Sequence, residues 1–226
     1  MGNEGFGPRV VFEIFGVQVS ETVTVTWFVM FLMILFCFFA TRNMQKKPKG
    51  FQLVGEIFVK TINGMTQQNM GEKNVGFAPY IGTLILFLAI ANLVGLIGLR
   101  PPTSDLNLTL CLSIITFVLT QYFGMKSKGL GGYAKGFFEP MPFLFPLNVV
   151  GELANPISLG FRIFGNVVAG VIIMSLIYGA LGSVLFGVFS LGVPVPLHLY
   201  FDLFSGLLQS FIFTMLTMVF ISGAME

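Results

Sequence analysis

Long apolar runs separated by short polar segments form the main pattern along this chain. The runs at residues 23–41, 77–99 and 106–124 each come close to the roughly 20 apolar residues that a helix needs to cross a bilayer core. We predict one membrane helix in each run. Ser20 and Glu21 are suited to cap the first turn of the first helix.

The last third of the chain contains a longer apolar region. Apart from Pro156, no strong stop signal interrupts residues 147–190, which would form about 66 Å of helix. An upright helix needs about half that length, so we expect this segment to be strongly tilted or broken near Gly179 or Gly182. A turn at 191–196 and a last helix to about Gly223 would complete a long, tilted helical hairpin over 147–223.

Residues 51–76 have a different pattern, in which apolar residues recur at three- and four-residue steps with polar residues between them. This spacing predicts an amphipathic helix on the membrane face, and a soluble loop helix is the alternative. The expected fold class is therefore all-α integral membrane, in a single domain 1–226, with about five membrane helices and one interfacial helix. The expected segments are an external N-terminal segment at 1–22, a first span at 23–41, a cytoplasmic loop with the amphipathic helix at 42–76, a two-helix hairpin at 77–125, a second cytoplasmic loop at 126–146, and the tilted hairpin at 147–223.

The composition supports a membrane protein. Only 10% of the residues are charged and 55% are hydrophobic, including 27 Phe, and the mean hydropathy is +0.88. A soluble protein of this size cannot bury so much apolar surface, and the disordered, collagen-like and disulfide-rich classes are also excluded.

The positive charges predict how the chain crosses the membrane. Nine of the 12 basic residues fall in two loops, and such loops are typically cytoplasmic. The first group is Arg42, Lys46, Lys47, Lys49, Lys60 and Lys73, and the second is Lys126, Lys128 and Lys135. We predict a multi-pass protein of the cell (inner) membrane, with its N-terminus outside, its C-terminus in the cytoplasm and no cleaved signal peptide. Clustered basic residues with interleaved aromatics are absent from the sequence, so nucleic acid is not an expected partner.

Four ionisable residues lie inside the hairpin: Glu152, Arg162, His198 and Asp202. Such residues are costly in a membrane and are candidates for function. At helical spacing, polar side chains of each helix share one face, which predicts a wet path beside or between the two helices. The first stripe is Asn148, Glu152, Asn155, Ser158, Arg162 and Asn166, and the second is His198, Asp202, Ser205 and Gln209.

Arg162 is the most informative of these residues, because an arginine stays protonated and is expensive at mid-membrane depth. We interpret it as a fixed positive charge that faces a partner carboxylate, and an internal ion pair with Glu152 or Asp202 is the alternative. Glu152 and Asp202 are either ion relays or acids near the water interface. His198 is either an interfacial residue or a relay.

No catalytic site of a soluble type is expected. One histidine cannot form a multi-His metal site, and GLGG at 129–132 is interpreted as a loop that lacks the features of a phosphate-binding loop. Cys37 and Cys111 are interpreted as small buried hydrophobic residues, neither bridged nor metal-bound. We therefore expect neither a cofactor nor a metal.

The stretch NPISLGFRIFGNVVAG at residues 155–170 closely resembles the signature of subunit a of F-type ATP synthases. The shared core is Pro-x-Ser-Leu-x-x-Arg-x-Phe-Gly-Asn-x-x-Ala-Gly. LLQSFIFTMLTMVFIS at 207–222 resembles the last helix of the family, and SDLNLTLCLSI at 104–114 with GMKSKGLGGY at 124–133 resemble its middle region. The resemblance covers nearly everything from Phe77 onward.

This resemblance implies a membrane stator that lies beside a rotating ring of c subunits, with b-type peripheral stalk subunits as neighbours and a soluble ATPase sector as an indirect partner. It implies that Arg162 is the essential arginine facing the ring carboxylate, that Asn166 and Gln209 are the conserved amides, and that two offset half-channels carry H+ or Na+. The function implied is coupling of ion flow to rotation and ATP synthesis.

Two positions depart from the family pattern. Many members carry Glu directly after the Ala-Gly pair, where this chain has Val171, and Asp202 stands where some members have His. We therefore expect the outer half-channel to use Asp202 and not position 171. The main alternative function is a secondary cation transporter or antiporter with an Arg162–Asp202 pair, and a third is a scaffold subunit without transport.

Overall fold

The computed structural model of the chain describes residues 10–14, 16–42, 44–138, 141–184 and 194–226. These residues are almost entirely helical apart from one short β-hairpin, in which β1 and β2 pair antiparallel. In chain order the elements are β1 (Val10–Ile14), β2 (Val17–Ser20), α1 (Glu21–Thr41), α2 (Phe51–Met70), the 3-10 helix η1 (Glu72–Phe77), α3 (Ala78–Leu93), η2 (Val94–Ile97), η3 (Pro102–Ser104), α4 (Leu106–Gly136), η4 (Pro142–Leu144), α5 (Phe145–Val184), α7 (Pro194–His198), the π-helix η5 (Leu199–Ser205) and α8 (Gly206–Met225).

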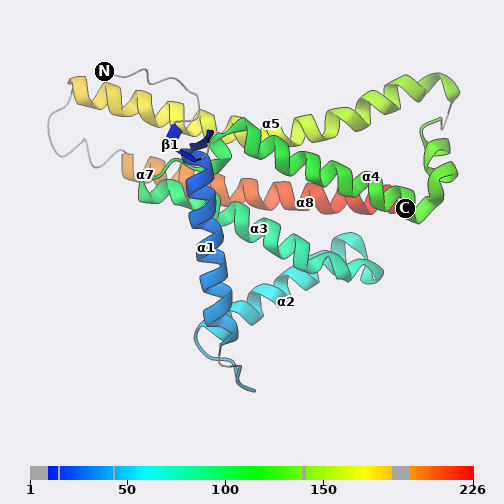
Figure 1. The fold of residues 1–226 in the computed structure, drawn as a ribbon, viewed down its shortest axis with the longest axis horizontal. Helices are drawn as coiled ribbons and strands as arrows, with labels where there is room; N and C mark the ends of the chain where they lie inside the picture. Colours follow the sequence, from blue (N-terminus) through cyan, green and yellow to red (C-terminus); the bar gives the residue numbers. More distant parts are fainter. Residues whose placement is uncertain (1–9, 15, 43, 139–140, 185–193) are drawn as a thin grey trace.

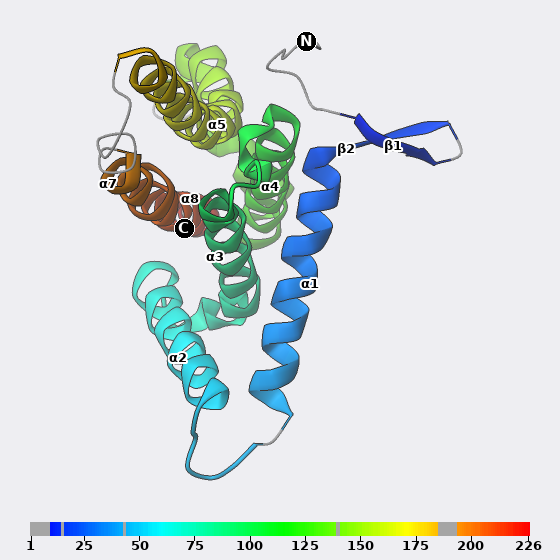
Figure 2. The ribbon, with the colours of Figure 1, turned by 90° about the vertical axis from the view of Figure 1, so that its left-hand side faces the viewer.

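Five helical regions of the described chain are long and apolar enough to cross a membrane. This confirms the predicted all-α membrane fold class. In Figure 1, α5 and α8 run alongside α4 and across the direction of α1, and the end-on view in Figure 2 shows the same arrangement. The last two long helices are therefore strongly inclined relative to the first, as expected from their length.

α5 settles the choice between a tilted and a broken segment. It is a single helix of 40 residues, about 60 Å long. It continues through Gly179 and Gly182, so the prediction of a break at either glycine is wrong.

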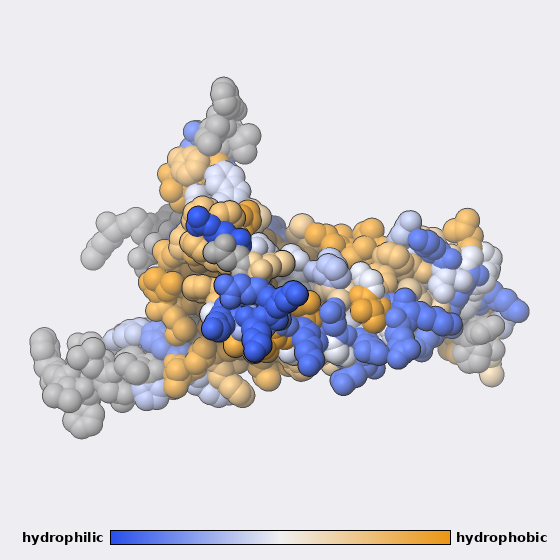
Figure 3. Space-filling model, turned by 90° about the horizontal axis from the view of Figure 1, so that it is seen from below, coloured by the Kyte–Doolittle hydropathy of each residue, from blue (hydrophilic) through white to orange (hydrophobic). Residues whose placement is uncertain are grey.

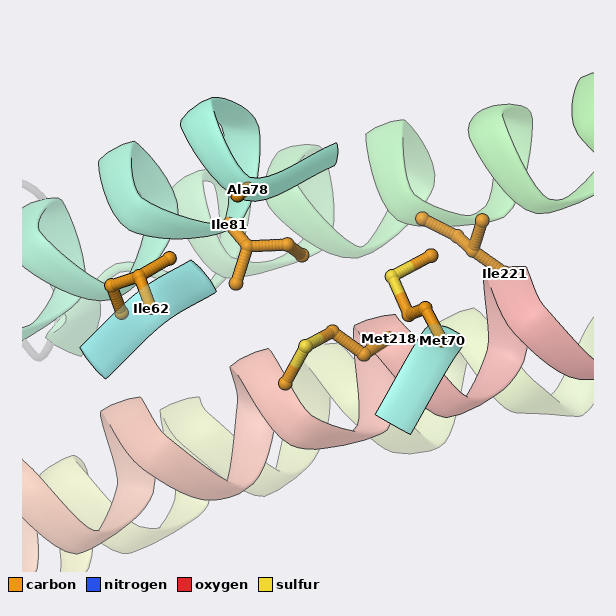
Figure 4. Packing of buried hydrophobic residues seen from close by; sticks show 6 residues of the cluster. All are labelled: Ile62, Met70, Ala78, Ile81, Met218 and Ile221. Atoms are coloured by element: carbon orange, nitrogen blue, oxygen red, sulfur yellow. The ribbon is translucent and has the colours of Figure 1, made fainter. Parts of the chain in front are cut away.

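α3 is the centre of the apolar core, because it contributes to all three buried clusters. The first cluster joins α2, α3 and α8 and is shown in Figure 4. The second joins α3, α5 and α8 through Leu88, Ile163 and Phe213, all fully buried. The third joins α1 to α3 through Val29 and Ala91. These contacts fix α5 and α8 against the rest of the chain.

α4 packs through small and polar side chains. Thr109, Ser113, Thr116 and Thr120 are buried along one face, and the Thr116 and Thr217 hydroxyl oxygens are 3.3 Å apart between α4 and α8. At Gly160 of α5, an added Cβ would lie 2.9 Å from the Ser113 hydroxyl. Small residues at such contacts let helix backbones approach closely, which is the main way that membrane helices gain packing energy.

The outer surface is largely apolar, with a hydrophilic band on one face. Figure 3 looks onto the face that carries α2 and shows this band running across it toward the end of the molecule where α4 leads into α5. Cys37 and Cys111 are free and both are exposed, so the prediction that they are buried is wrong. Membrane helices carry apolar residues on surfaces that face lipid as well as core, and hydropathy does not separate the two.

Several local features differ from the sequence prediction. Residues 126–136 are helical rather than a loop, because α4 continues to Gly136 with one non-helical residue, Gly129 (φ 74°, ψ 159°). The last helix begins at Pro194 instead of Pro196, and the start of the predicted turn at 191–193 lies outside the described residues. The β-hairpin within the predicted external segment was not anticipated. Ser20 precedes α1 as expected, but its side chain makes no capping hydrogen bond.

Candidate functional site

Arg162 lies on α5 beside the buried face of that helix. Leu159 and Ile163 pack into the core against α3 and α8, whereas Arg162 itself is exposed. Within the described part of the chain its guanidinium forms no salt bridge, either with Glu152 or with another acid. A permanent cation on an apolar helix is thus left available to a group outside this chain.

On one side of Arg162 along α5 lies a cavity of about 620 Å³, which we call the wide cavity. It is enclosed by α4, α5 and the end of α8, close to where α4 leads into α5. Its polar lining includes Asn148, Glu152 and Asn155 of α5, together with Lys128 and Tyr133 of α4. The predicted site residues Glu152 and Asn155 therefore share one space with a cation and a phenol.

Pro156 lines the wide cavity and leaves one backbone carbonyl oxygen of α5 without its helical hydrogen bond. A proline has no backbone N–H, so the carbonyl oxygen of Glu152, four residues earlier, receives no helical hydrogen bond from it. An unpaired carbonyl inside an apolar helix is costly unless water or another donor reaches it. A cavity wide enough for water meets that requirement.

On the other side of Arg162 lies a pocket of only about 20 Å³, which we call the narrow pocket. It lies between α5 and the start of α8, next to the connection between α3 and α4. Its polar lining consists of amides and one hydroxyl, with no ionisable side chain among the described residues: Asn92, Asn166, Ser205 and Gln209.

Asn166 and Gln209 connect the two helices of the hairpin at this pocket. The Asn166 Nδ2 donates to the Gln209 Oε1 at 2.8 Å. Gln209 is only 2% exposed, and its own Nε2 is a buried donor with no hydrogen-bond partner among the described residues. A buried donor of this kind usually has an ordered water as its partner, and a space of about 20 Å³ is large enough for one.

Asn92 of α3 anchors the start of α8 beside the narrow pocket. Its Nδ2 donates to the Gly206 carbonyl oxygen and to the Ser210 Oγ, both at 3.0 Å, and its Oδ1 accepts from the Thr103 Oγ1 at 2.5 Å. Asn92 and Thr103 are both buried. Gly206 is required here, because an added Cβ would lie 2.9 Å from the Asn92 Cβ.

The second predicted polar stripe is only partly present. Ser205 and Gln209 reach the narrow pocket, but the Nε2 of His198 lies 2.8 Å from the Tyr178 hydroxyl instead. The prediction of one shared face assumed α-helical spacing, and the π-helix Leu199–Ser205 adds a residue to the turn and breaks that spacing. Asp202 belongs to the π-helix, but its side chain lies outside the described residues.

Four polar residues at or beside these spaces were missed by the sequence analysis: Asn92, Thr103, Gln121 and Tyr133. Asn92 could have been found, because it is an isolated amide within the apolar run 77–99. Thr103 and Tyr133 lie in segments that were interpreted as connections, where a polar residue carries no special signal. Among the described residues, no cluster of His, Cys, Asp or Glu is suited to hold a metal ion.

This chain is similar to known proteins over most of its length. A family model described as "ATP synthase A chain" matches residues 23–222. "ATP synthase subunit a, sodium ion specific" from Propionigenium modestum is 38% identical, over 97% of this chain and 78% of the relative. "ATP synthase subunit a" from Moorella thermoacetica is 35% identical over 96% of this chain and 95% of the relative. The corresponding protein of Priestia megaterium is 36% identical over 98% and 97%.

Proposed function

This chain belongs to the ATP synthase A chain family, the ion-translocating stator subunits (subunit a) of F-type ATP synthases, and from that premise we propose how its residues move ions. Arg162 faces the carboxylate of a neighbouring ring of c subunits. The wide cavity and the narrow pocket belong to two half-channels that reach this carboxylate from opposite sides of the membrane.

The single observation that carries the proposal is the exposed guanidinium of Arg162 on an apolar helix, which forms no salt bridge with any side chain that the structure describes. Leaving this charge in lipid would cost at least about 2.5–3.5 kcal/mol, so a partner anion is needed to compensate. A rotor carboxylate in lipid prefers to be neutral, with its ion bound. Beside Arg162 its charged form is favoured, so it releases the ion there, and the fixed cation opposes direct passage of ions between the half-channels.

The wide cavity is suited to the half-channel on the cytoplasmic side. It lies by the segment that contains Lys126, Lys128 and Lys135, which the charge pattern assigns to the cytoplasm. This orientation puts the N-terminus outside and the C-terminus in the cytoplasm. Glu152 and Asn155 would then be its ion-pathway residues.

The narrow pocket is suited to the inner end of the half-channel from the outside, near the connection at Pro101. Asn166, Ser205 and Gln209 would pass the ion on, through a water bound to the Gln209 Nε2. Asp202 and His198 precede Ser205 and Gln209 along the chain and would lie toward the outer opening. The transported ion is H+ or Na+.

The proposed orientation of the chain also predicts which surfaces contact partner subunits. The side of α5 that carries Arg162 would face the ring of c subunits. We assign b-type stalk subunits to other apolar surfaces of the chain, such as the groove of about 900 Å³ that α1, α2 and α3 enclose. The amphipathic α2 would lie in the cytoplasmic membrane interface, with its apolar face at the level of the lipid headgroups.

The test is to reconstitute the complete ATP synthase into vesicles and replace Arg162. We expect Arg162→Ala to abolish ATP-driven ion uptake and ion-driven ATP synthesis, because the rotor carboxylate would no longer be induced to release its ion. Arg42→Ala is the matched control, since Arg42 is an exposed arginine at the end of α1, far along the chain from both spaces.

Full coupled activity in Arg162→Ala would overturn the proposal. The alternative of a secondary transporter predicts a different result, namely ion exchange by this chain alone in vesicles without a c ring. A second measurement distinguishes the ions: if added sodium protects ATP hydrolysis from a carboxylate-modifying carbodiimide, the transported ion is Na+.

A further inference from the structure

A chain of three polar side chains crosses from α4 to α5 at the edge of the wide cavity. The Tyr133 hydroxyl donates to the Gln121 Oε1 at 2.6 Å, and the Gln121 Nε2 donates to the Glu152 Oε2 at 3.3 Å. Tyr133 and Glu152 line both the wide cavity and a second, mostly apolar cavity of about 460 Å³, which Gln121 also lines. The three side chains therefore form part of the partition between a polar space and an apolar one.

Two glycines of α4 make this arrangement possible. Gly129 adopts a positive φ of 74°, which other residues rarely adopt, and the following residues through Gly136 form a separate helical turn. The ring of Tyr133 then lies against Gly124, where an added Cβ would be 2.8 Å from the Tyr133 Cε2. The kink and the missing side chain together bring Tyr133 back within reach of Gln121, which precedes it by 12 residues.

Further hydrogen bonds hold the kinked segment in place. The Ser127 Oγ donates to the carbonyl oxygen of Met225 at the end of α8, at 2.8 Å. The Asn148 Nδ2 of α5 donates to the carbonyl oxygen of Phe137 at 2.9 Å. The segment that carries Tyr133 is thus fixed to both other helices that enclose the wide cavity.

We propose that Tyr133 and Gln121 are positioning residues that hold the Glu152 carboxylate in the wall of the wide cavity and adapt to its protonation state. This inference rests on the proposed function, because it assigns the wide cavity to ion transfer. The donors in the chain all point toward Glu152, which is the order that an ionised carboxylate requires.

The central amide gives this chain a second stable arrangement. When Glu152 takes up a proton, rotation of the Gln121 amide by half a turn places its Oε1 to accept from the carboxylic acid and its Nε2 to donate to the Tyr133 oxygen. A glutamine thus serves both protonation states, whereas an apolar residue of similar size serves neither. No bond to carbon changes, and the proton on Glu152 comes from the cavity.

Few other charged or titratable side chains share these cavities with Glu152 and could affect its protonation. Among the described residues that line the wide cavity, Lys128 and Tyr133 of α4 are the titratable ones besides Glu152, and α8 contributes none. The second cavity adds no further titratable group in the described part of the chain. A change in the pH dependence of transport can therefore be assigned to this small set.

The test is a double-mutant cycle in the complete ATP synthase reconstituted into vesicles. Tyr133→Phe and Gln121→Leu are made singly and together, and ATP-driven ion uptake is measured against pH on the side of the ATPase sector. We expect each single change to slow uptake by about twofold to tenfold, the effect of one lost hydrogen bond, and to displace the pH profile. The double variant should be no slower than Gln121→Leu alone, because Tyr133 acts only through Gln121.

Two further variants keep the test decisive. Tyr122→Phe is the matched control, since Tyr122 is an exposed tyrosine of the same helix, and its pH profile should match the unmodified enzyme. Gln121→Met replaces Gln121→Leu if the latter does not assemble, because it keeps the length of the side chain.

Independent, additive effects in the double variant, or an unchanged pH profile in Tyr133→Phe, would overturn the inference. Either result would leave the proposed function intact if the unmodified enzyme transports ions and Arg162→Ala does not. If Arg162→Ala transports ions normally, the proposed function itself fails.

Discussion

The wide cavity and the narrow pocket are built by the same two long helices but in opposite ways. The wide cavity has about 620 Å³ of space and contains a carboxylate, a lysine and a phenol. The narrow pocket has about 20 Å³ and is lined by amides and a hydroxyl, and two of these amides, Asn166 and Gln209, hydrogen-bond each other. Water can supply missing hydrogen bonds in the first space, whereas the second has room for about one molecule.

This difference indicates where the chain tolerates change. In a space filled by water, a lost side-chain hydrogen bond is replaced by a bond to water, and the net cost is small. In a space with room for about one water molecule, the partner of a lost group stays buried and unpaired, which costs about 1–3 kcal/mol. Substitutions in the narrow pocket should therefore be more damaging than chemically similar ones in the wide cavity.

The largest expected effect is at Gly160, which lies on α5 between the two spaces. An added Cβ would lie 2.9 Å from the Ser113 Oγ and 3.3 Å from the Cα of Leu110, so Gly160→Leu would force α5 away from α4. We expect ATP-driven ion uptake to fall to background. Gly151→Leu is the control, because Gly151 lines the wide cavity with nothing within 4 Å of an added Cβ, and most of the uptake should persist. Equal loss in both variants would contradict the comparison.

The second largest effect is expected at Gln209 in the narrow pocket. Gln209→Leu removes the acceptor of the Asn166 amide, and we expect ion uptake to fall by roughly 5-fold to 150-fold, as for a buried group left unpaired. Asn155→Leu in the wide cavity removes a comparable amide from a space that water can fill, and should cost less. Parallel uptake assays on reconstituted enzyme rank the two, and a larger loss for Asn155→Leu would reverse the proposed difference.

The smallest effect is expected at Thr116, which lines the wide cavity and lies at the contact between α4 and α8. Thr116→Val keeps the shape of the side chain and removes the hydroxyl that lies 3.3 Å from that of Thr217. Such interhelical bonds in membranes contribute about 0.6 kcal/mol on average. We expect a slight decrease in the temperature at which the assembled enzyme loses coupled uptake, with the rate at room temperature unchanged. A loss of transport comparable to that of Gln209→Leu would show that Thr116 belongs to the pathway.

Hydropathy and charge predicted much of this molecule, because a bilayer places strict demands on length and polarity. The spans, the amphipathic α2 and the long hairpin all follow from those demands. The helical spacing of the polar residues also identified Glu152 and Asn155 of the wide cavity, and Asn166, Ser205 and Gln209 of the narrow pocket.

Other features could not be predicted from the same patterns. A π-helix such as Leu199–Ser205 forms where one helical turn takes up an additional residue, and the hydropathy of the segment does not show which turn that is. The helical course of residues 126–136 depends on contacts with distant residues, such as Ser127 with Met225. The exposure of Cys37 and Cys111 depends on which side of an apolar helix faces the core, and an apolar run has no side that composition can distinguish.

The position of Arg162 between the two spaces has an electrical consequence. If water enters both spaces from opposite sides, as proposed, the insulating part of the membrane is reduced to the stretch between Asn155 and Asn166, about 16 Å of α5. Because α5 is strongly inclined, this stretch covers at most that much of the membrane depth. The whole transmembrane voltage then falls across it instead of across about 30 Å of hydrocarbon, which raises the local field by about twofold or more. Each ion gains about 2.3 kcal/mol per 100 mV over that short distance, next to the charge that regulates its release.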